Sequence, residues 1–545
     1  MRLVEIRDLD GPNIFLLAPA LKLEFAVQPE DERPEGLQRL RERLRPLGVD
    51  EASDPDPDAP EELGAVLAEA VAAVHRRSGV EAPACLWVGM ETPGQFTLAW
   101  PWRRRAFTIA VARLVASAAV GEEGDFGAAM AELPGLLDGD DPEDRPLMIR
   151  DSERRIPAIG VTGTNGKTTT TRLIAHTLQL AGVHPGWTST SGVFIDGELV
   201  LEGDYSGPAG ARRVLGDPAA EVAVLESARG GILLRGLAYE SNDISVFTNV
   251  SGDHLGLHGI HTVRGLAQVK ALVCRVTRPE GWAVLNADDA LVRGATAGLR
   301  AKPFWVTQDP TNPTVLADLA EGGRAVLLDD GWIVEARGGD RHPIVPVAEV
   351  PITFGGRAAH MVENTLCAAA ACLAVGRSHA EVAAGLRDFG SRPDDNLGRN
   401  DVYRHNGGIA IIDYAHNEAG VIHLWKLARS FVEPGGRLTA VIGSAGDRTD
   451  EHLRTLGRLA GEAADRVVMK GTQKYLRGRQ STEEIEALMA AGVAEAGKGI
   501  DRRYETEAEA IAAEVRMLGP GDVVAVMCFE NPAEARAVAA AAAIP

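Results

Sequence analysis

The stretch GVTGTNGKTTTTRL, residues 160–173, indicates both the fold and the chemistry of this chain. Its ending, Gly-Lys-Thr, is that of a phosphate-binding loop, but Val161 stands where the pattern G-x-x-x-x-G-K-[ST] has its first glycine. The residues before it, IPAIGVTG, predict a buried strand, and KTTTTRLIAHTLQLAGV predicts a helix. Because a strand, a glycine-rich turn and a helix direct backbone N–H groups at phosphate oxygens, we predict a nucleotide site here.

The residue types of the loop suit phosphate binding. Gly163 and Gly166 permit a tight turn. Lys167 can neutralise charge on the β- and γ-phosphates, and Thr168 can be a ligand of Mg²⁺. Four consecutive threonines are unfavourable at the start of a helix, which indicates a functional reason for them. The loop alone does not identify the reaction.

Composition limits the class of protein. A chain of 545 residues with 45% hydrophobic residues predicts several domains with ordinary cores. A net charge of −21 argues against general binding of nucleic acid or of an anionic membrane surface. The sequence contains no stretch of about 18 apolar residues, which a membrane-spanning helix would need. Acidic residues near the N-terminus argue against a signal peptide. The five cysteines form no C-x-x-C pair and are interpreted as reduced thiols, so we expect a cytoplasmic enzyme.

Charged, proline-containing segments predict the organisation of the chain. A linker is expected at 137–155, and an exposed loop at 51–62. Strands then alternate with helices in two series, which predicts mostly parallel, doubly wound sheets. Residues 300–352 predict an additional small sheet, followed by helices at 360–376 and 379–388.

Polar residues follow the next predicted strands. Glu226 ends one strand, Asp253 and His254 follow another, and Lys270 lies in a helical segment. An acid and a histidine near a phosphate loop could complete a magnesium site. Taken singly, Asp253 could instead cap a helix and Lys270 could be a surface lysine.

Six motifs in this order resemble those of the Mur ligase superfamily, the ATP-dependent enzymes that form amide bonds. They are GTNGKTTTT, LES, GDHLGLHG, LNADD, GR at 398–399 and DYAHN at 413–417. That family has the same shortened glycine spacing, and the similarity covers 156–545. The segments SGVFIDGELVLEGDYSGPAGARRVL and ESARGGILLRGL resemble the Mur-like part of the cyanophycin synthetase branch. The opening EIRDLDGPNIFLL resembles the start of that branch's N-terminal domain.

The resemblance implies an α/β protein in three domains. These are a smaller α+β N-terminal domain at 1–150, a central P-loop ATPase domain at 156–388 and a C-terminal Rossmann-like domain at 389–545. It also implies ATP and two Mg²⁺ ions as cofactors. Residues implied to bind the nucleotide are Gly163, Thr164, Asn165, Gly166, Lys167, Thr168, Thr169, Asn286, Arg399, Asp413 and His416.

The resemblance implies catalytic roles for Lys167, Glu226, His254 and Lys270. Thr168 and Glu226 would hold the first Mg²⁺, and His254 the second. Lys270 would carry a CO₂ adduct that supplies a further anionic ligand. An acceptor carboxylate would attack the γ-phosphate, and an amino acid amine would then displace phosphate from the acyl phosphate. Candidate substrate contacts are Ser206, Gly207, Arg229, Lys474, Arg477 and Arg479.

The sequence departs from the cyanophycin branch in three places. The roughly 150 residues before the Mur-like part leave no room for an ATP-grasp domain, so we expect a partner ATP-grasp ligase or a ready-made carboxylate on a peptide or polymer. The segment KGTQKYL, 470–476, is basic where arginine-using relatives are acidic, which favours an amine that carries a carboxylate, or is a solvated basic face. Trp100, Trp102 and Arg103–Arg105 could dock an anionic polymer or form an interface.

Other interpretations remain at this point. The chain could be an inactive nucleotide-binding scaffold for a partner ligase, or a folylpolyglutamate-type or peptidoglycan-type ligase. Retention of Lys167, Glu226, His254 and Lys270 argues against the scaffold. The long cyanophycin-like segments argue against the other ligases. A homo-oligomer is possible for any of them.

Overall fold

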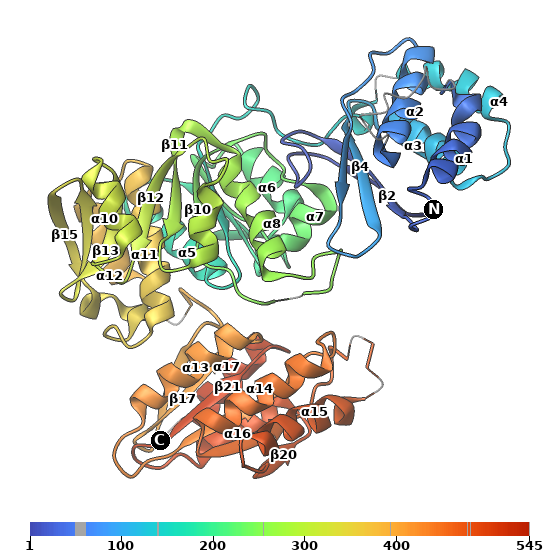
Figure 1. The fold of residues 1–545 in the computed structure, drawn as a ribbon. Coiled ribbons are helices and arrows are strands. Elements are labelled where there is room, and N and C mark those ends of the chain that lie inside the picture. Colours follow the sequence, from blue (N-terminus) through green and yellow to red (C-terminus); the bar gives the residue numbers. More distant parts are fainter. Residues whose placement is uncertain are drawn as a thin grey trace.

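The computed structural model describes residues 1–49, 62–138, 141–253, 255–392, 394–476, 478–479 and 481–543. Strands of these residues form three sheets, and Figure 1 shows each sheet with its own helices. We call the three parts the N-terminal, central and C-terminal units. The predicted loop at 51–62 lies outside the described residues except for Glu62. Among the described helices, none is long and apolar enough to cross a membrane.

The N-terminal unit is an antiparallel sheet of order β1-β2-β4-β3 with helices on one face. Its strands are β1 (Arg2–Leu9), β2 (Ala20–Ala26), β3 (Leu86–Gly89) and β4 (Gln95–Pro101). Its helices are α1 (Pro34–Leu44), α2 (Leu63–Arg77), α3 (Arg105–Val120) and α4 (Phe126–Glu132). Leu21, Leu23 and Phe25 alternate with the charged residues Lys22 and Glu24 on β2 and pack against the helices.

The aromatic and basic segment before α3 is not an exposed docking edge. Trp100 is fully buried and Trp102 is 4% exposed, so both belong to the core of the N-terminal unit. Arg105 lies over the Trp102 ring and pairs with Asp8 at 2.8 Å and Asp10 at 2.6 Å. The prediction of a polymer-docking surface at these tryptophans was therefore wrong.

The central unit contains an eleven-stranded sheet of order β15-β14-β13-β12-β11-β10-β5-β9-β6-β7-β8. Its strands are β5 (Ala158–Thr162), β6 (Pro185–Ser189), β7 (Gly192–Ile195), β8 (Glu198–Glu202), β9 (Val222–Glu226), β10 (Asn242–Phe247), β11 (Thr277–Asn286), β12 (Lys302–Thr307), β13 (Arg324–Asp329), β14 (Trp332–Arg337) and β15 (Asp340–Pro346). Strands from β13 to β6 run parallel, and every residue of β5 and β9 is buried, as expected for strands covered on both faces.

Residues 300–352 extend this sheet and do not form a separate small one. Strands β12 and β13 continue the parallel order, and β14 and β15 add an antiparallel edge. Alternation within short runs predicted the strands correctly, but it carries no information about which sheet they join.

Helices cover both faces of the central sheet. They are α5 (Lys167–Leu180), α6 (Pro208–Leu215), α7 (Arg229–Arg235), α8 (Val263–Arg275), α9 (Ala290–Arg293), α10 (Pro313–Ala320), α11 (Ala359–Ala374) and α12 (His379–Asp388). Apolar residues of α5, α11 and α12 pack against one face, and those of α6, α7 and α8 pack against the other. The predicted helices at 360–376 and 379–388 are confirmed.

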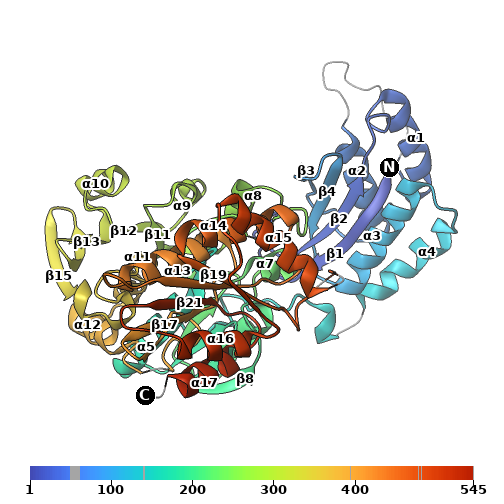
Figure 2. The same cartoon turned by 90° about the horizontal axis from the view of Figure 1, so that it is seen from below.

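The C-terminal unit is a six-stranded sheet of order β16-β17-β21-β18-β19-β20, parallel except for β16. Its strands are β16 (Asp401–His405), β17 (Gly408–Asp413), β18 (Leu438–Ile442), β19 (Arg466–Lys470), β20 (Arg502–Tyr504) and β21 (Val523–Met527). Its helices are α13 (Glu418–Phe431), α14 (Asp450–Ala463), α15 (Thr482–Glu495), α16 (Glu507–Arg516) and α17 (Pro532–Ala542). Figure 2 shows α16 and α17 on one face of this sheet and α13–α15 on the other.

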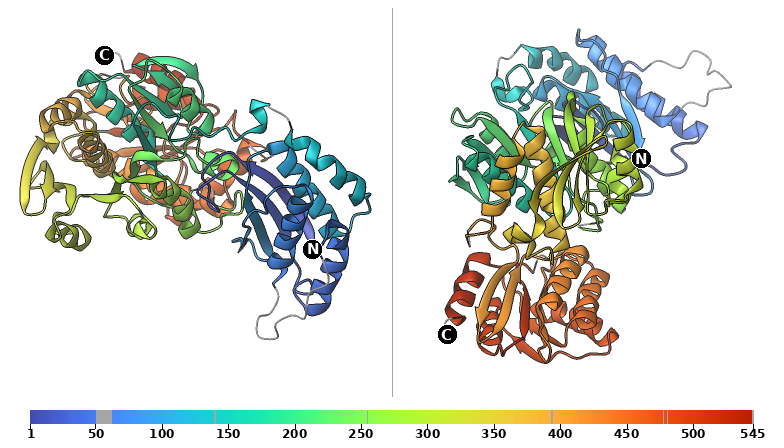
Figure 3. Two further views of the ribbon diagram at one scale, coloured as in Figure 1. Left: turned by 90° about the horizontal axis from the view of Figure 1, so that it is seen from above. Right: turned by 90° about the vertical axis from the view of Figure 1, so that its left-hand side faces the viewer.

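The C-terminal unit lies beside the central unit, while the N-terminal unit packs near α7 and α8 (Figures 1 and 3). Asn165, which precedes α5, and Asn417, which precedes α13, exchange two side-chain hydrogen bonds of 3.2 and 3.0 Å. The phosphate loop therefore faces the boundary between the central and C-terminal units.

Candidate active site

The phosphate loop between β5 and α5 depends on two glycines. Gly163 has φ 150° and Gly166 has φ 84°, conformations that L side chains rarely adopt. A Cβ on Gly163 would lie 1.9 Å from Thr248 Oγ1, and one on Gly166 would lie 2.0 Å from Asn364 Oδ1. The two glycines of the loop thus have a geometric basis, because the backbone needs both the conformation and the space at these two positions.

Residues after β10 hold the loop in place. Asn249 Oδ1 accepts a 2.9 Å hydrogen bond from the Asn165 N–H, and the Asn249 carbonyl accepts one of 2.8 Å from the Thr164 N–H. Thr248 Oγ1 donates to the Asn165 carbonyl at 2.6 Å. Asn286 donates to the Thr248 carbonyl at 2.8 Å. Asn286 is therefore a support for the loop and does not line the cavity described below.

Lys167, Thr168 and Glu226 lie together at the start of α5. Lys167 Nζ donates to the Thr164 carbonyl at 2.9 Å, and Thr168 Oγ1 donates to Glu226 Oε2 at 3.0 Å. Glu226 ends β9 and is 2% exposed. Burial raises the pKa of the Glu226 carboxyl, whereas Lys167 and the Thr168 hydroxyl oppose this rise.

Lys270 is a buried residue of α8 and not a surface lysine. Its side chain is oriented into the site, and Nζ donates to the Gly163 carbonyl at 2.6 Å. Burial, followed by repulsion from Lys167, lowers the pKa of the Lys270 ammonium well below its ordinary value. Burial and Lys167 thus both disfavour the charged form of this amine, whereas Asp253 and Glu226 act in the opposite direction.

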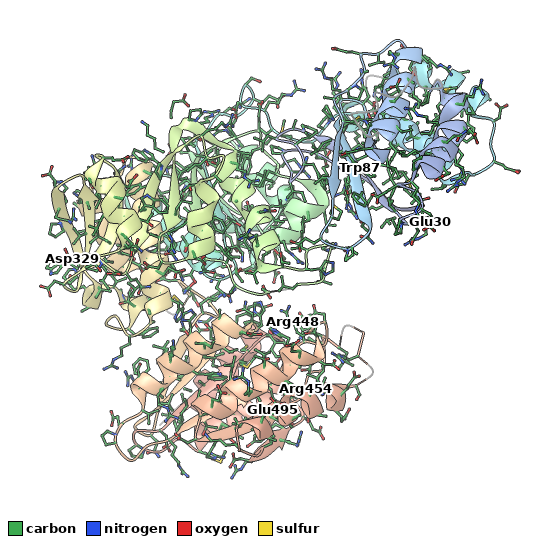
Figure 4. The ribbon with its side chains drawn as sticks, viewed as in Figure 1. Glu30, Trp87, Asp329, Arg448, Arg454 and Glu495 are labelled. Atoms are coloured by element: carbon green, nitrogen blue, oxygen red, sulfur yellow. The ribbon has the colours of Figure 1, made fainter. Side chains whose placement is uncertain are left out.

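Asp253 does not cap α8, because Thr262 is the N-cap residue of that helix. Its Oδ1 lies 3.4 Å from Arg448 Nη1 of the C-terminal unit, and both side chains are largely buried. Arg448 is on the side of the C-terminal unit that faces the central sheet (Figure 4). This ion pair and the Asn165–Asn417 pair are two polar links between the units. His254 lies outside the described residues.

A cavity of about 600 Å³ joins the central and C-terminal residues. Of the predicted site residues, those lining it are Thr164, Asn165, Gly166, Lys167, Thr168, Thr169, Ser206, Gly207, Glu226, Arg229, Lys270, Arg399, Asp413 and His416. Gly163 is next to it and contributes its carbonyl to Lys270. Most of the predicted nucleotide residues are thus brought together on one cavity.

The C-terminal side of the cavity is formed by residues around the end of β17. Asp413 accepts a 2.8 Å hydrogen bond from the Asn400 N–H, and burial raises the pKa of its carboxyl. The Arg399 guanidinium lies 4.8 Å from the centre of the Tyr414 ring. Burial lowers the pKa of His416 to about 4, so this imidazole is neutral near pH 7.

Sequence reasoning missed several cavity residues on α11 and α13. His360 and His423 lie with ring centres 4.9 Å apart, and His360 Nε2 is 2.9 Å from Asn400 Nδ2. Burial lowers the pKa of His360 to about 3. Asn364 contacts Gly166, as described above. The sequence feature that could have revealed them is the segment HMVEN, which places a histidine, a glutamate and an asparagine at the start of an otherwise alanine-rich, buried helix.

The basic segment 470–476 does not lie where the prediction placed it. Lys470 has a fully buried side chain that pairs with Glu507 at 2.7 Å and lies 3.8 Å from the centre of the Phe529 ring. Lys474 is exposed and does not line the cavity. Lys470 is therefore not available to an incoming carboxylate, and that part of the prediction was wrong.

Arg479 also lies off the cavity. Its guanidinium pairs with Asp450 and Glu484, both at 2.7 Å, and donates to the Arg448 carbonyl at 2.8 Å. This arrangement stabilises the loop before α14 and does not present the guanidinium to a substrate. Arg477 lies outside the described residues.

Donor side chains for a metal ion are not clustered in the described part of the chain. No set of three or more His, Cys, Asp and Glu side chains is grouped there as a metal site would require. The Thr168 hydroxyl and the Glu226 carboxylate are hard oxygen donors of the kind that Mg²⁺ takes, usually together with water and phosphate oxygens.

Comparison with known proteins gives the family. The profile of the Mur ligase middle domain matches residues 161–372, and that of the Mur ligase, glutamate ligase domain, matches residues 398–528. Cyanophycin synthetase of Trichormus variabilis is 37% identical over 384 residues, which are 70% of this chain and 42% of that protein. The chain thus spans less than half the length of this relative.

This chain covers most of the length of two further relatives. The UDP-N-acetylmuramoyl-L-alanyl-D-glutamate–2,6-diaminopimelate ligase of Chlorobium phaeobacteroides is 30% identical over 381 residues, 68% of this chain and 70% of that enzyme. The structure of E. coli FolC in complex with ADP has a TM-score of 0.52 and 19% identity, and covers 71% of this chain and 89% of FolC. That likeness shows the fold, which confirms the predicted α/β class. The chain belongs to the Mur ligase family.

Proposed function

We propose that this protein is an ATP-dependent ligase that activates a substrate carboxylate and couples it to the amine of an amino acid. The observation that carries the proposal is one cavity lined by a phosphate loop, a buried carboxyl group at Glu226 and a buried lysine at Lys270. Membership of the Mur ligase family supports it, as does the identity with a cyanophycin synthetase.

The residues present fit a nucleotide. Gly163 and Gly166 allow the tight loop that leads into the N-terminus of α5, where backbone N–H groups can bind phosphate. We propose that residues 163–169 bind the phosphates and that Arg399, Asp413 and His416 contact the base and ribose. The neutral rings of His360 and His423 add a partly apolar surface on the same side of the cavity. FolC, which shares the fold, is described with ADP bound.

The donor set at Glu226 fits a divalent cation. Burial disfavours the ionised Glu226 carboxylate, and a cation beside it and the Thr168 hydroxyl would favour that form again. When bound, Mg²⁺ would neutralise phosphate charge. We propose two ions, with His254 holding the second. The neutral amine of Lys270 is the form that reacts with CO₂, which supports the carbamate implied by the family resemblance.

The residues of the cavity then have separable roles. We propose that Ser206, Gly207 and Arg229 bind the acceptor carboxylate beside the phosphate loop. Lys167 would stabilise the charge that develops as the carboxylate takes the γ-phosphoryl group. The amine would enter from the C-terminal side and displace phosphate, giving the amide. Contact between the units limits the access of water to the acyl phosphate.

The substrate classes are narrower proposals. Identity with cyanophycin synthetases supports a peptide or polymer that carries free carboxylates as the acceptor, and an amino acid as the amine. We further propose the division at 1–150, 156–388 and 389–545, and a separate ATP-grasp ligase as the source of the acceptor. Pairing of Lys470 with Glu507 removes one argument against arginine as the amine.

A phosphate-release screen tests the proposal. Purified protein would be given MgATP, each of the twenty amino acids, and either polyaspartate or a short β-linked Asp-Arg peptide. We expect phosphate release that requires both an acceptor and one amine, with an amide product of matching mass. Release of phosphate without any product in all combinations would contradict a ligase and favour a nucleotide-hydrolysing scaffold.

A further inference from the structure

Two consecutive residues of α11 support the phosphate loop. Asn364 fills the space beside Gly166, where it excludes any side chain. Glu363 acts through Asn249, because its Oε1 accepts a 2.7 Å hydrogen bond from Asn249 Nδ2. Asn249 is the residue that contacts the Asn165 N–H of the loop.

The orientation of the Asn249 amide matters because its two ends differ. The oxygen accepts from the Asn165 N–H at 2.9 Å, while the nitrogen donates to Glu363 and, at 3.3 Å, to the Asn165 carbonyl. An ionised carboxylate only accepts hydrogen bonds. In its ionised form Glu363 therefore requires the NH₂ end of Asn249 to face α11, which leaves the oxygen for the loop. The reversed amide would place a donor against the Asn165 N–H.

The surroundings of Glu363 disfavour its ionised form, so the hydrogen bond from Asn249 acts to keep the carboxyl group ionised. Burial raises its pKa to about 7, and Asp289 and Asp288 add repulsion, while the Asn249 and Asn286 amides act in the opposite direction. A carboxyl group in such a place destabilises the fold relative to an apolar residue unless its hydrogen bonds compensate. Most of the remaining α11 positions are apolar and buried.

We propose that Glu363 is a positioning residue for nucleotide binding, which fixes the Asn249 amide and through it the Asn165 N–H of the phosphate loop. This inference rests on the proposed function only in that the loop binds a nucleotide. Glu363 does not itself contact the nucleotide in this account. Its effect is on the shape of the loop and so on nucleotide affinity, whichever carboxylate and amine are used.

Two substitutions at Glu363 separate the hydrogen bond from the charge. Glu363→Met removes the acceptor, and we expect the dissociation constant of AMPPNP with Mg²⁺ to rise about tenfold or more. Glu363→Gln keeps an oxygen that can accept from Asn249, so its constant should stay within about threefold of the wild type. Glu381, which caps α12 away from the loop, gives the matched control Glu381→Gln, with no expected change.

A second test exchanges the amide of Asn249 and the carboxyl group of Glu363 between the two positions. Asn249→Asp alone would set two carboxyl groups against each other and weaken AMPPNP binding by at least about tenfold. Adding Glu363→Gln restores a donor and an acceptor with their direction reversed, and the new carboxylate still accepts from the Asn165 N–H. We expect the double variant to bind within about fivefold of the wild type.

Binding would be measured by calorimetry with AMPPNP and Mg²⁺, and folding by thermal melting of each variant. Unchanged AMPPNP affinity in Glu363→Met would overturn this inference while the proposed function stands. So would a double variant whose loss of affinity is the product of the losses in the two single variants. If Glu363→Met melts early, the double variant decides, because a general loss of stability in Asn249→Asp would not be restored by adding Glu363→Gln. Failure of the wild type to bind AMPPNP would overturn the nucleotide site itself and this inference with it.

Discussion

The phosphate loop and the segment after β19 are both short and rich in charge or glycine, but they differ in what determines their structure. The phosphate loop is fixed by backbone conformation at Gly163 and Gly166. The charge of Lys470 at the end of β19 is neutralised by Glu507, which is 37 residues away in the sequence. The first kind of site can be recognised from spacing, whereas the second depends on a tertiary partner.

The largest expected effect comes from breaking the Lys470–Glu507 pair. Lys470→Met leaves a buried carboxylate without its cation, and we expect the free energy of unfolding to fall by about 3–5 kcal/mol. Lys474→Met, at an exposed position of the same segment, should change it by less than about 0.5 kcal/mol. Urea denaturation of both variants measures this. Equal small changes would mean that Lys470 is not a structural residue, and would restore it as a candidate for substrate binding.

The phosphate loop is tested by a pair of glycines. Gly166→Ala and Gly182→Ala both place a side chain at positive φ, but only the first would meet another residue, since the space around Gly182 is open. We expect Gly166→Ala and Lys167→Ala each to lower kcat/KM by about 10²–10³-fold. Gly182→Ala should cost only about 1 kcal/mol of stability. Comparable losses of activity at both glycines would show that backbone strain, and not the fit of the loop, limits the reaction.

Lys270 distinguishes function from stability within the same cavity. Lys270→Met removes a buried amine from an environment that disfavours its charge, so the free energy of unfolding should stay the same or rise. Activity should fall by about 10²-fold, if the lysine supports the metal and phosphate charges. Steady-state kinetics and denaturation on one preparation give both values. Retained activity in a stable variant would remove Lys270 from the catalytic group.

The smallest expected effect is on the pH dependence of the free energy of unfolding. The folded pKa of His360, about 3, is below that of the unfolded chain, so the unfolded state binds more protons between pH 6.5 and pH 3. Stability should therefore decrease as the pH falls through this window, by on the order of 1–2 kcal/mol down to pH 5 from this residue. His360→Asn should flatten the curve of unfolding free energy against pH. An unchanged slope would show that His360 is protonated as readily in the folded state.

Sequence patterns gave most of the site because family motifs lie at the ends of buried parallel strands. The positions of Glu226 and Asp413, which end β9 and β17, follow from this rule. Asn286 donates a hydrogen bond to the Thr248 carbonyl, which spacing could not show, and its contact with a nucleotide stays a prediction. His360 and Glu363 were missed because their partners, His423 and Asn249, are distant from them in the sequence. Trp100 was misread because adjacent arginines suggested exposure, although the ring is fully buried.

The most direct test of the central claim follows the oxygen atoms of the acceptor. With ¹⁸O in the acceptor carboxylate, attack on the γ-phosphate and displacement by the amine must leave one ¹⁸O in the released phosphate. We predict inorganic phosphate that carries one ¹⁸O atom for each amide formed, together with ADP, measured by mass spectrometry. Phosphate free of ¹⁸O in a reaction that still forms the amide would contradict activation of the carboxylate as an acyl phosphate.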